Sequence, residues 1–142
     1  MSHADTVKSS DDVIQMLRQH GLRPTRQRVE IASLLLCGGN RHVSPDGIYE
    51  ELKAGCGQMA IGTVYNTLRQ FCDAGLLKEL HGVGDRLVYD TNTSHHHHFL
   101  DTDTGQLVDI DSRDMRVQNL PDLPSGYDLD AVEVTIRISR NA

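Results

Sequence analysis

The chain of 142 residues has no tryptophan, and aromatic residues make up only 4% of it. A large core would therefore have to be built from aliphatic side chains. No apolar run approaches the roughly 20 residues that a membrane-spanning helix needs, so no membrane association is expected. The N-terminal segment has neither a basic start nor an apolar stretch, which argues against a secretory signal and predicts a cytoplasmic protein.

Cysteine is also scarce. Cys37, Cys56 and Cys72 are widely spaced, odd in number and form no CxxC pair. Neither a disulfide framework nor a thiolate zinc site is therefore predicted. The three thiols are expected to be buried or half-buried in a reducing compartment.

Acidic residues outnumber basic residues, and the net charge is −6. The excess of acidic residues is uneven along the chain: residues 91–142 hold 4 basic and 9 acidic residues, whereas residues 1–90 hold 10 basic and 11 acidic residues. Within the first half, Arg18, Arg23, Arg26 and Arg28 fall in eleven residues that contain no acid. Such a local basic patch can bind phosphates although the whole chain is acidic.

The first half has the pattern of a winged helix-turn-helix. Capping residues, apolar residues at helical spacing and closing glycines predict four helices, over residues 10–20, 25–37, 45–55 and 61–74. Alternating apolar residues over 76–81 and 86–90, with a glycine-containing turn between them, then predict a β-hairpin. Winged helices bind DNA or proteins, so the pattern alone leaves both partners open.

The last third predicts a separate, β-rich unit. Residues 96–101 and 106–111 flank a turn, and the alternating segment 131–138 predicts a third strand. Three strands in about 50 residues make a thin core, which suits half of a dimer better than a free-standing domain.

Four consecutive histidines, His95 to His98, begin this last third. If the run is extended, His96 and His98 share one face, and His95 and His97 share the other. A single ion can then take two of them easily, and further ligands must come from elsewhere. The candidates are His42, Asp90 and Asp109. A His and carboxylate set without thiolate suits Zn, Fe or Mn.

Several motifs, in order along the chain, resemble the ferric uptake regulator family. They are Gly21-Leu22-Arg23-Pro24-Thr25-Arg26-Gln27-Arg28, His42-Val43-Ser44, Thr63-Val64-Tyr65, Phe71-Cys72-Asp73-Ala74-Gly75-Leu76, and the histidine run followed by Gly105-Gln106-Leu107-Val108-Asp109. The resemblance implies an α+β fold, with a winged-helix DNA-binding domain and hinge over residues 1–90 and an α/β dimerisation and metal-binding domain over 91–142. It implies a homodimeric transcription regulator, not an enzyme, that binds an A·T-rich palindromic operator.

The resemblance also implies a regulatory ion at the domain junction. Carried over by position, its ligands are His42, Asp90, His96, His98 and Asp109, and the ion is Fe, Mn or Zn. His95 and His97 fall where the family has a second metal site, and they are also the pair expected to bind haem. The family's structural zinc uses a CxxC pair where this chain has Asp101 and Thr104, so a four-cysteine zinc site is predicted to be absent.

A cysteine-free, histidine-rich segment most resembles the iron response regulator (Irr) branch, which controls iron and haem metabolism genes and loses DNA binding when haem is bound. The alternatives within the family are a peroxide sensor resembling PerR and a manganese-responsive repressor. A small metalloenzyme using His96 and His98 is the alternative from another class, but the sequence has no HExxH motif.

The helix over 61–74 is expected to enter the major groove, because the second helix of a helix-turn-helix does so. The residues expected to contact DNA are Arg23, Arg26, Thr63, Tyr65, Asn66 and Arg69.

Overall fold

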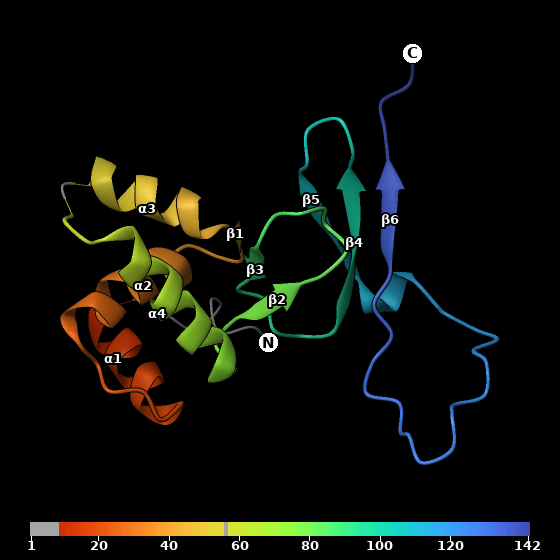
Figure 1. Cartoon of the computed structure of the whole chain (residues 1–142), viewed down its shortest axis with the longest axis horizontal. Coiled ribbons are helices and arrows are strands. Elements are labelled where there is room, and N and C mark those ends of the chain that lie inside the picture. The colour runs from red at the N-terminus through yellow and green to blue at the C-terminus, as the bar shows by residue number, and fades with distance from the viewer. Residues whose placement is uncertain (1–8, 56) are drawn as a thin grey trace. The chain divides into compact units, whose positions relative to one another are not determined.

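The computed structural model describes residues 9–55 and 57–142. It divides into two compact units, the first ending at Ser94 and the second spanning His95–Ala142 (Figure 1). The first contains four α-helices and a small sheet, and the second a small sheet of its own. Among the helices of the described residues, none has the length and apolar character needed to cross a membrane.

The four helices of the first unit follow the predicted boundaries closely: α1 is Ser10–Gln19, α2 Arg26–Leu36, α3 Pro45–Ala54 and α4 Ile61–Asp73. The first three begin at side-chain caps, because the hydroxyls of Ser9, Thr25 and Ser44 each accept a backbone N–H of the following turn. Each such cap stabilises its helix by about 1 kcal/mol. Cap chemistry, which is readable in the sequence, therefore sets where these helices start.

The core of the first unit is mostly aliphatic, as the composition predicts, with Phe71 and Tyr89 as its buried aromatic residues. Leu17 of α1, Leu35 of α2 and Ile48 of α3 are fully buried and belong to one cluster. Helix α4 contributes Val64, Leu68 and Phe71. Because this apolar stripe fixes the rotation of α4, its neighbouring polar residues are turned outward.

The predicted hairpin is confirmed, with shorter strands than expected: β2 is Lys78–Leu80 and β3 is Val88–Asp90, paired antiparallel. A further strand that the sequence did not predict, β1 (His42–Val43), pairs antiparallel with β3 on its other side. The sheet order is β1-β3-β2. A helix-turn-helix followed by this hairpin is a winged helix.

The second unit is a three-stranded sheet in the order β5-β4-β6. Strands β4 (His96–Asp101) and β5 (Leu107–Asp111) form the predicted antiparallel hairpin. The third strand, β6 (Thr135–Ile138), runs parallel to β4 and is shorter than predicted.

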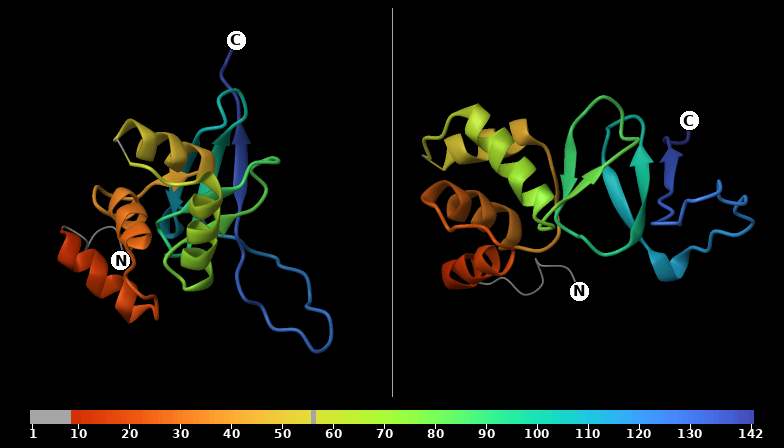
Figure 2. Two further views of the ribbon diagram at one scale, coloured as in Figure 1. Left: turned by 60° about the vertical axis from the view of Figure 1, so that its left-hand side comes forward. Right: turned by 60° about the horizontal axis from the view of Figure 1, so that its bottom comes forward.

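The expectation of an α/β second domain differs from the structure. Among the described residues 95–142 there is a short 3-10 helix, Ser112–Asp114, but no α-helix. Residues 115–134 run as a long irregular connection between β5 and β6 (Figures 1 and 2). Pro121 and Pro124 lack the backbone N–H that a helix interior needs, and Gly126 has a positive φ of 87°. These residues explain why no helix forms there.

The cysteine expectations hold in part. Cys72 of α4 is half-buried, and burial raises the pKa of its thiol. Cys37 was wrongly predicted to be buried or half-buried, because it is exposed at the C-terminal end of α2. Cys56 lies outside the described residues.

Candidate metal centre and nucleic-acid interface

Among the residues that the structure describes, His and Asp side chains that could hold a metal ion occur in both units, two in the first and three in the second. They are His42 and Asp90 in the first unit, and His96, His98 and Asp109 in the second. These are the five residues that the sequence proposed as ligands.

In the first unit, pairing of β1 with β3 sets His42 directly opposite Asp90. Nε2 of His42 lies 3.2 Å from Oδ2 of Asp90, whose other oxygen accepts the N–H of Asn92 at 2.9 Å. Arg41 and Thr91 continue the pairing, because the Arg41 N–H donates to Oγ1 of Thr91 at 2.8 Å and the Thr91 N–H donates to the Arg41 carbonyl at 3.0 Å. Backbone pairing and this Asx turn therefore fix the direction of the buried carboxylate.

In the second unit, the same kind of register pairing brings three groups together. His98 of β4 is the partner of Asp109 of β5, and strand alternation places His96 on the same face. Nε2 of His98 and Nε2 of His96 lie 3.3 Å and 3.5 Å from the same oxygen, Oδ1 of Asp109. The ring centroids of His96 and His98 are 4.5 Å apart. One carboxylate oxygen is thus shared by two imidazoles.

These separations suit ligands of a common ion. Two ligand atoms that each lie about 2.1 Å from one ion, at tetrahedral to octahedral angles, are about 3.0 to 3.4 Å from each other. The His42–Asp90 separation and both Asp109 separations fall in or next to this range. The donor set of imidazole nitrogen and carboxylate oxygen suits Fe, Mn or Zn. The residues present therefore fit a divalent metal.

The opposite face of β4 is different. The rings of His95 and His97 lie 5.1 Å apart, so the predicted splitting of the histidine run into two pairs is confirmed. Nδ1 of His97 accepts the backbone N–H of Val134 at 3.0 Å. A neutral imidazole that accepts at Nδ1 carries its proton on Nε2, and neither nitrogen then offers a free lone pair to a metal. Burial, followed by the charges of the neighbouring histidines, lowers the pKa of His97.

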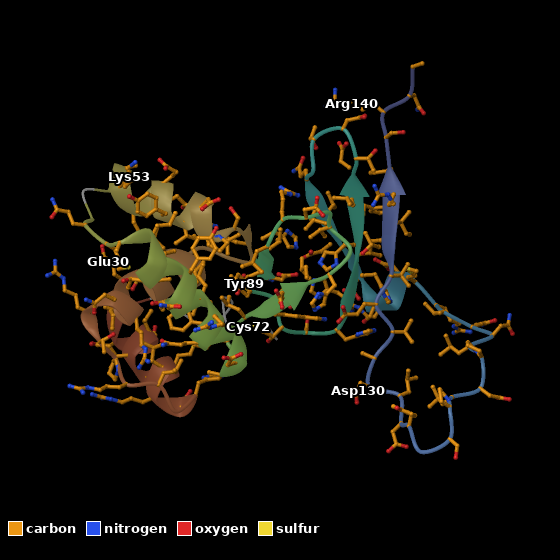
Figure 3. The ribbon with its side chains drawn as sticks, in the orientation of Figure 1. Glu30, Lys53, Cys72, Tyr89, Asp130 and Arg140 are labelled. Atoms are coloured by element: carbon orange, nitrogen blue, oxygen red, sulfur yellow. The ribbon has the colours of Figure 1, made fainter. Side chains whose placement is uncertain are left out.

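The end of β4 and the turn after it hold Asp101 and Thr104, the two positions where the resemblance implies a CxxC pair. Oδ1 of Asp101 accepts the N–H groups of Asp103 and Thr104 at 2.9 and 3.2 Å, and these bonds lower the pKa of Asp101. The Thr102 N–H donates to the Ile138 carbonyl at 2.8 Å. Oδ2 of Asp103 accepts the N–H of Arg140 at 3.0 Å, near the labelled Arg140 in Figure 3. Hydrogen bonds thus join this turn to the end of β6.

The residues predicted to contact DNA all lie in the first unit. Tyr65, Asn66 and Arg69 are exposed on α4, and Thr63 on the same helix is half-buried. Arg26 is exposed at the start of α2, and Arg23 is exposed in the segment just before it. The Tyr65 hydroxyl donates to Oδ1 of Asp46 at 3.1 Å, and this bond raises the pKa of the phenol. Arg69 Nη2 donates to Oδ1 of Asn66 at 3.3 Å.

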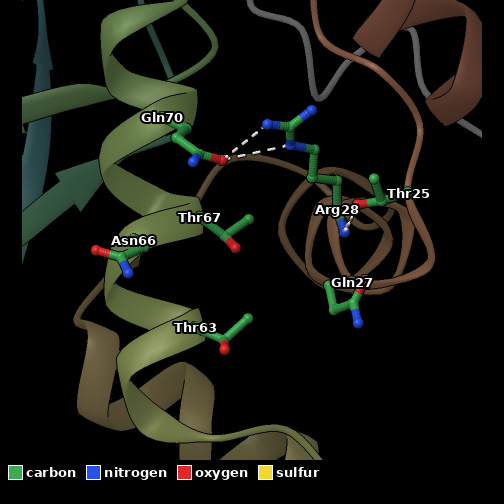
Figure 4. Close-up of a pocket in the computed structure, with 7 residues that line it drawn as sticks. All are labelled: Thr25, Gln27, Arg28, Thr63, Asn66, Thr67 and Gln70. Atoms are coloured by element: carbon green, nitrogen blue, oxygen red, sulfur yellow. Dashed lines mark hydrogen bonds between the residues drawn. The ribbon is translucent and has the colours of Figure 1, made fainter.

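Sequence reasoning missed a polar pocket between the start of α2 and α4. Its lining is Thr25, Gln27, Arg28, Thr63, Asn66, Thr67 and Gln70 (Figure 4). The four α4 residues are spaced at i, i+3, i+4 and i+7, which is a polar stripe beside the buried one. That spacing is the signal that could have identified the pocket.

The sequence also matches known proteins. A family model described as "Ferric uptake regulator family" matches residues 19–137. The chain is 35% identical over 100 residues to the peroxide-responsive repressor PerR of Staphylococcus aureus (strain Mu50). The aligned segment covers 70% of this chain and 67% of that protein. The chain belongs to the ferric uptake regulator family.

Membership identifies the chain as a metal-responsive, DNA-binding transcription regulator and not an enzyme. Regulators of this family are dimers with an N-terminal winged-helix DNA-binding domain and a dimerisation domain. The resemblance to the Irr branch stays a prediction, because the named relative is a PerR.

Solved structures agree on the fold. The ferric uptake regulator of Pseudomonas aeruginosa with manganese has a TM-score of 0.70 at 23% identity, covering 92% of this chain and 98% of that one. The ferric uptake regulator of Francisella tularensis with iron has a TM-score of 0.68 at 24% identity, covering 84% and 92%. At this level of identity, the likeness concerns the fold alone.

Proposed function

We propose that the chain is an iron-responsive regulator of the Irr type, in which one divalent ion is held by residues of both units and favours DNA binding. The ligands are His42, Asp90, His96, His98 and Asp109. The observation that carries this proposal is the geometry within each unit. Imidazole nitrogens lie at ligand-to-ligand distances from carboxylate oxygens in both. One unit supplies two donors and the other supplies three, so neither set alone fills the coordination shell of an ion. This favours one ion that is bound by both sets.

Chain connectivity also supports a shared ion. Asp90 ends β3 and His96 begins β4, so only residues 91–95 separate a ligand of the first set from a ligand of the second. Within this connection, Oδ1 of Asn92 accepts the Ser94 N–H at 3.1 Å. A short connection lowers the entropy lost when two sets of ligands close around one ion.

The proposed regulation is geometric. Bound metal supplies the positive charge that five nitrogen and oxygen donors can share. His42 and Asp90 then hold the winged helix at one angle to the sheet that carries His96, His98 and Asp109. In a homodimer this angle sets the spacing of the two α4 helices. To convert a population from about 1% to about 99% DNA-competent, the ion must bind that arrangement roughly 10⁴-fold more tightly.

Iron and haem metabolism genes are the proposed targets, with an A·T-rich palindrome as operator and repression or activation left to experiment. The missing CxxC pair and the histidine run support the Irr assignment. Haem then acts as the releasing signal by removing histidines from the metal set. Because Nδ1 of His97 is engaged by Val134, haem ligation at His97 requires that contact to break.

A parallel DNA-binding titration with Mn(II), Fe(II), Zn(II) and haem tests this proposal. We expect divalent metal to raise operator affinity and haem to lower it. DNA binding that is indifferent to all four additions contradicts the proposal. Activation by metal with no haem effect refutes the Irr assignment while retaining a metal-dependent regulator.

Peroxide sensing is the second candidate, supported by the 35% identity to the S. aureus PerR. In that case Fe(II) with peroxide oxidises a ligand histidine and ends DNA binding. Mass spectrometry of the Fe(II) form after peroxide treatment distinguishes the two. One added oxygen atom on His42 or His96 favours the peroxide sensor, and unmodified ligands with haem-dependent release favour the Irr type. A manganese-responsive repressor would respond to Mn(II) alone.

A further inference from the structure

The polar pocket of the first unit has an unusual charge balance. It has a volume of about 240 Å³ and is lined by Thr25, Gln27, Arg28, Thr63, Asn66, Thr67 and Gln70. Hydroxyls, amides and one guanidinium line it, and no carboxylate does, although the chain has 20 acidic residues. The lining therefore offers hydrogen-bond donors and one positive charge, which is the chemistry that recognises a phosphate.

Among the described residues, the hydrogen-bond partners of the Arg28 side chain are all neutral. Its Nε and Nη2 both donate to Oε1 of Gln70, at 3.3 and 3.0 Å, and its Nη1 donates to the Arg23 carbonyl at 3.0 Å (Figure 4). By contrast, Arg41 is paired with Glu51 at 2.7 Å and Arg113 with Asp111 at 2.8 Å. A guanidinium has five N–H groups, so Arg28 keeps two donors for another partner. Its positive charge is positioned without being neutralised.

Two elements that bear on DNA meet at this pocket. Thr25 caps the start of α2, where backbone N–H groups favour an anion. Thr63 and Asn66 lie on α4, the helix expected in the major groove, and the pocket extends along α4 to Thr67 and Gln70. A DNA backbone beside that groove would present phosphates to this side of α4.

We propose that this pocket is the seat of one backbone phosphate of the operator, contacted by Arg28 and the hydroxyl and amide donors around it, with Gln70 as the residue that positions the guanidinium. This inference rests on the proposed DNA-binding function and adds contacts beyond the residues predicted from sequence. Because a phosphate carries no base information, the contact fixes the position of α4 and not the sequence that it reads.

The salt dependence of DNA binding tests the proposal. The metal-loaded full chain is titrated with an A·T-rich palindromic duplex and with a mixed-sequence duplex of equal length, between about 50 and 200 mM salt. The slope of log K against log salt is negative, and Arg28→Gln is expected to make it less steep by about 0.9 per subunit, hence by about 1.8 for a dimer. The loss of affinity should be similar on both duplexes. Arg113→Gln, an exposed arginine of the second unit, is the matched control and should leave the slope unchanged.

A second variant guards against misfolding of the first. Gln70→Glu nearly preserves side-chain shape and can still accept from Arg28, but it places a negative charge beside the guanidinium. It should make the slope less steep as Arg28→Gln does, whereas Gln15→Glu, an exposed position on α1, should not. When a single neutral methylphosphonate is scanned along the duplex, one position per half-site should weaken binding of the wild type but not weaken binding of Gln70→Glu any further.

Wild-type slopes in both folded variants overturn the phosphate seat while leaving metal-dependent DNA binding intact. Failure of the wild-type chain to bind either duplex under every metal condition instead refutes the proposed function. A reduced slope in both variants, with unchanged controls, supports the seat.

Discussion

The backbone N–H of Val134 donates to Nδ1 of His97 over 3.0 Å, and the Val134 carbonyl accepts the N–H of His98 at 3.1 Å. One residue just before β6 is thus bound through both of its backbone groups to two neighbouring histidines of β4. His98 takes part through its main chain, whereas His97 takes part through its ring. This relationship makes His97 a residue that fastens the start of β6, and it sets His97 apart from His96 and His98 although all three are adjacent.

Replacing His97 by phenylalanine keeps a ring but removes the acceptor. Because a half-buried N–H then loses its partner, we expect the free energy of unfolding to fall by about 1 kcal/mol. The Val134 amide should exchange with solvent several-fold faster, as measured by hydrogen exchange. Mn(II) affinity should change little, since His97 lies outside the proposed ligand set. The matched control is His95→Phe at the exposed neighbour, which should leave Val134 exchange unchanged. Equal exchange of Val134 in wild type and His97→Phe would show that the ring does not hold β6.

The turn after β4 predicts that the fold does not depend on metal. Hydrogen bonds from Thr102 to Ile138 and from Arg140 to Asp103 join this turn to the end of β6. These contacts hold the two segments together without a zinc ion. Chelation should therefore leave the far-ultraviolet circular dichroism unchanged. Removing a bound ligand lowers the free energy of unfolding by about 2.7 kcal/mol when the ligand was present at 100 times its Kd. The melting temperature should fall by no more than this loss of stability produces. Cooperative unfolding on chelation at room temperature is the result that this account does not allow.

The carboxylate of Asp101 predicts a pH effect. Two backbone N–H groups and the Thr104 hydroxyl favour its charged form, so its pKa lies below the ordinary 3.8. A lowered pKa in the folded state stabilises the fold above pH 3.8, and this stabilisation is lost as the pH falls through the folded-state pKa. Wild type should therefore be more stable than Asp101→Asn at pH 6, and the difference should shrink below about pH 4. Urea unfolding of both proteins across this range measures it; a difference that grows on acidification has the opposite sign and refutes the assignment.

Tyr65 allows its ring and its hydroxyl to be separated. The hydroxyl donates to Asp46 within the protein, so we expect the ring to be the part that contacts DNA. Tyr65→Phe should keep operator affinity within about threefold, and Tyr65→Ala should lower it about tenfold or more, in the range of a lost apolar base contact. Fluorescence anisotropy with an operator duplex compares them. Equal losses in the two variants would place the hydroxyl at the DNA instead.

Local chemistry made much of the fold predictable. Ser9, Thr25 and Ser44 mark helix starts in the sequence and cap those helices in the structure. The histidine run was correctly split into two faces, because side chains alternate along any strand whatever surrounds it. The wing followed from alternation over residues 76–90.

What the sequence left unpredicted depends on partners distant in the chain. Strand β1 has only two residues, too few to show a period, and exists because β3 pairs with it. The contact of His97 with Val134 joins positions 37 residues apart and is invisible in either segment alone. The pocket around Arg28 likewise needs α2 and α4 side by side. The five proposed ligands came from the resemblance and from face alternation, and their joint role stays a prediction.

The measurement that tests the central claim most directly is calorimetric titration of Mn(II) into wild type, His42→Ala and His98→Ala. A single ion shared by both units predicts one ion per chain in wild type. It predicts that removing one ligand from either unit weakens binding by a similar factor, at least about tenfold, with metal-dependent operator binding lost in parallel. Wild-type affinity in His42→Ala, with the loss confined to His98→Ala, would show that the second unit binds its ion alone and would contradict the account.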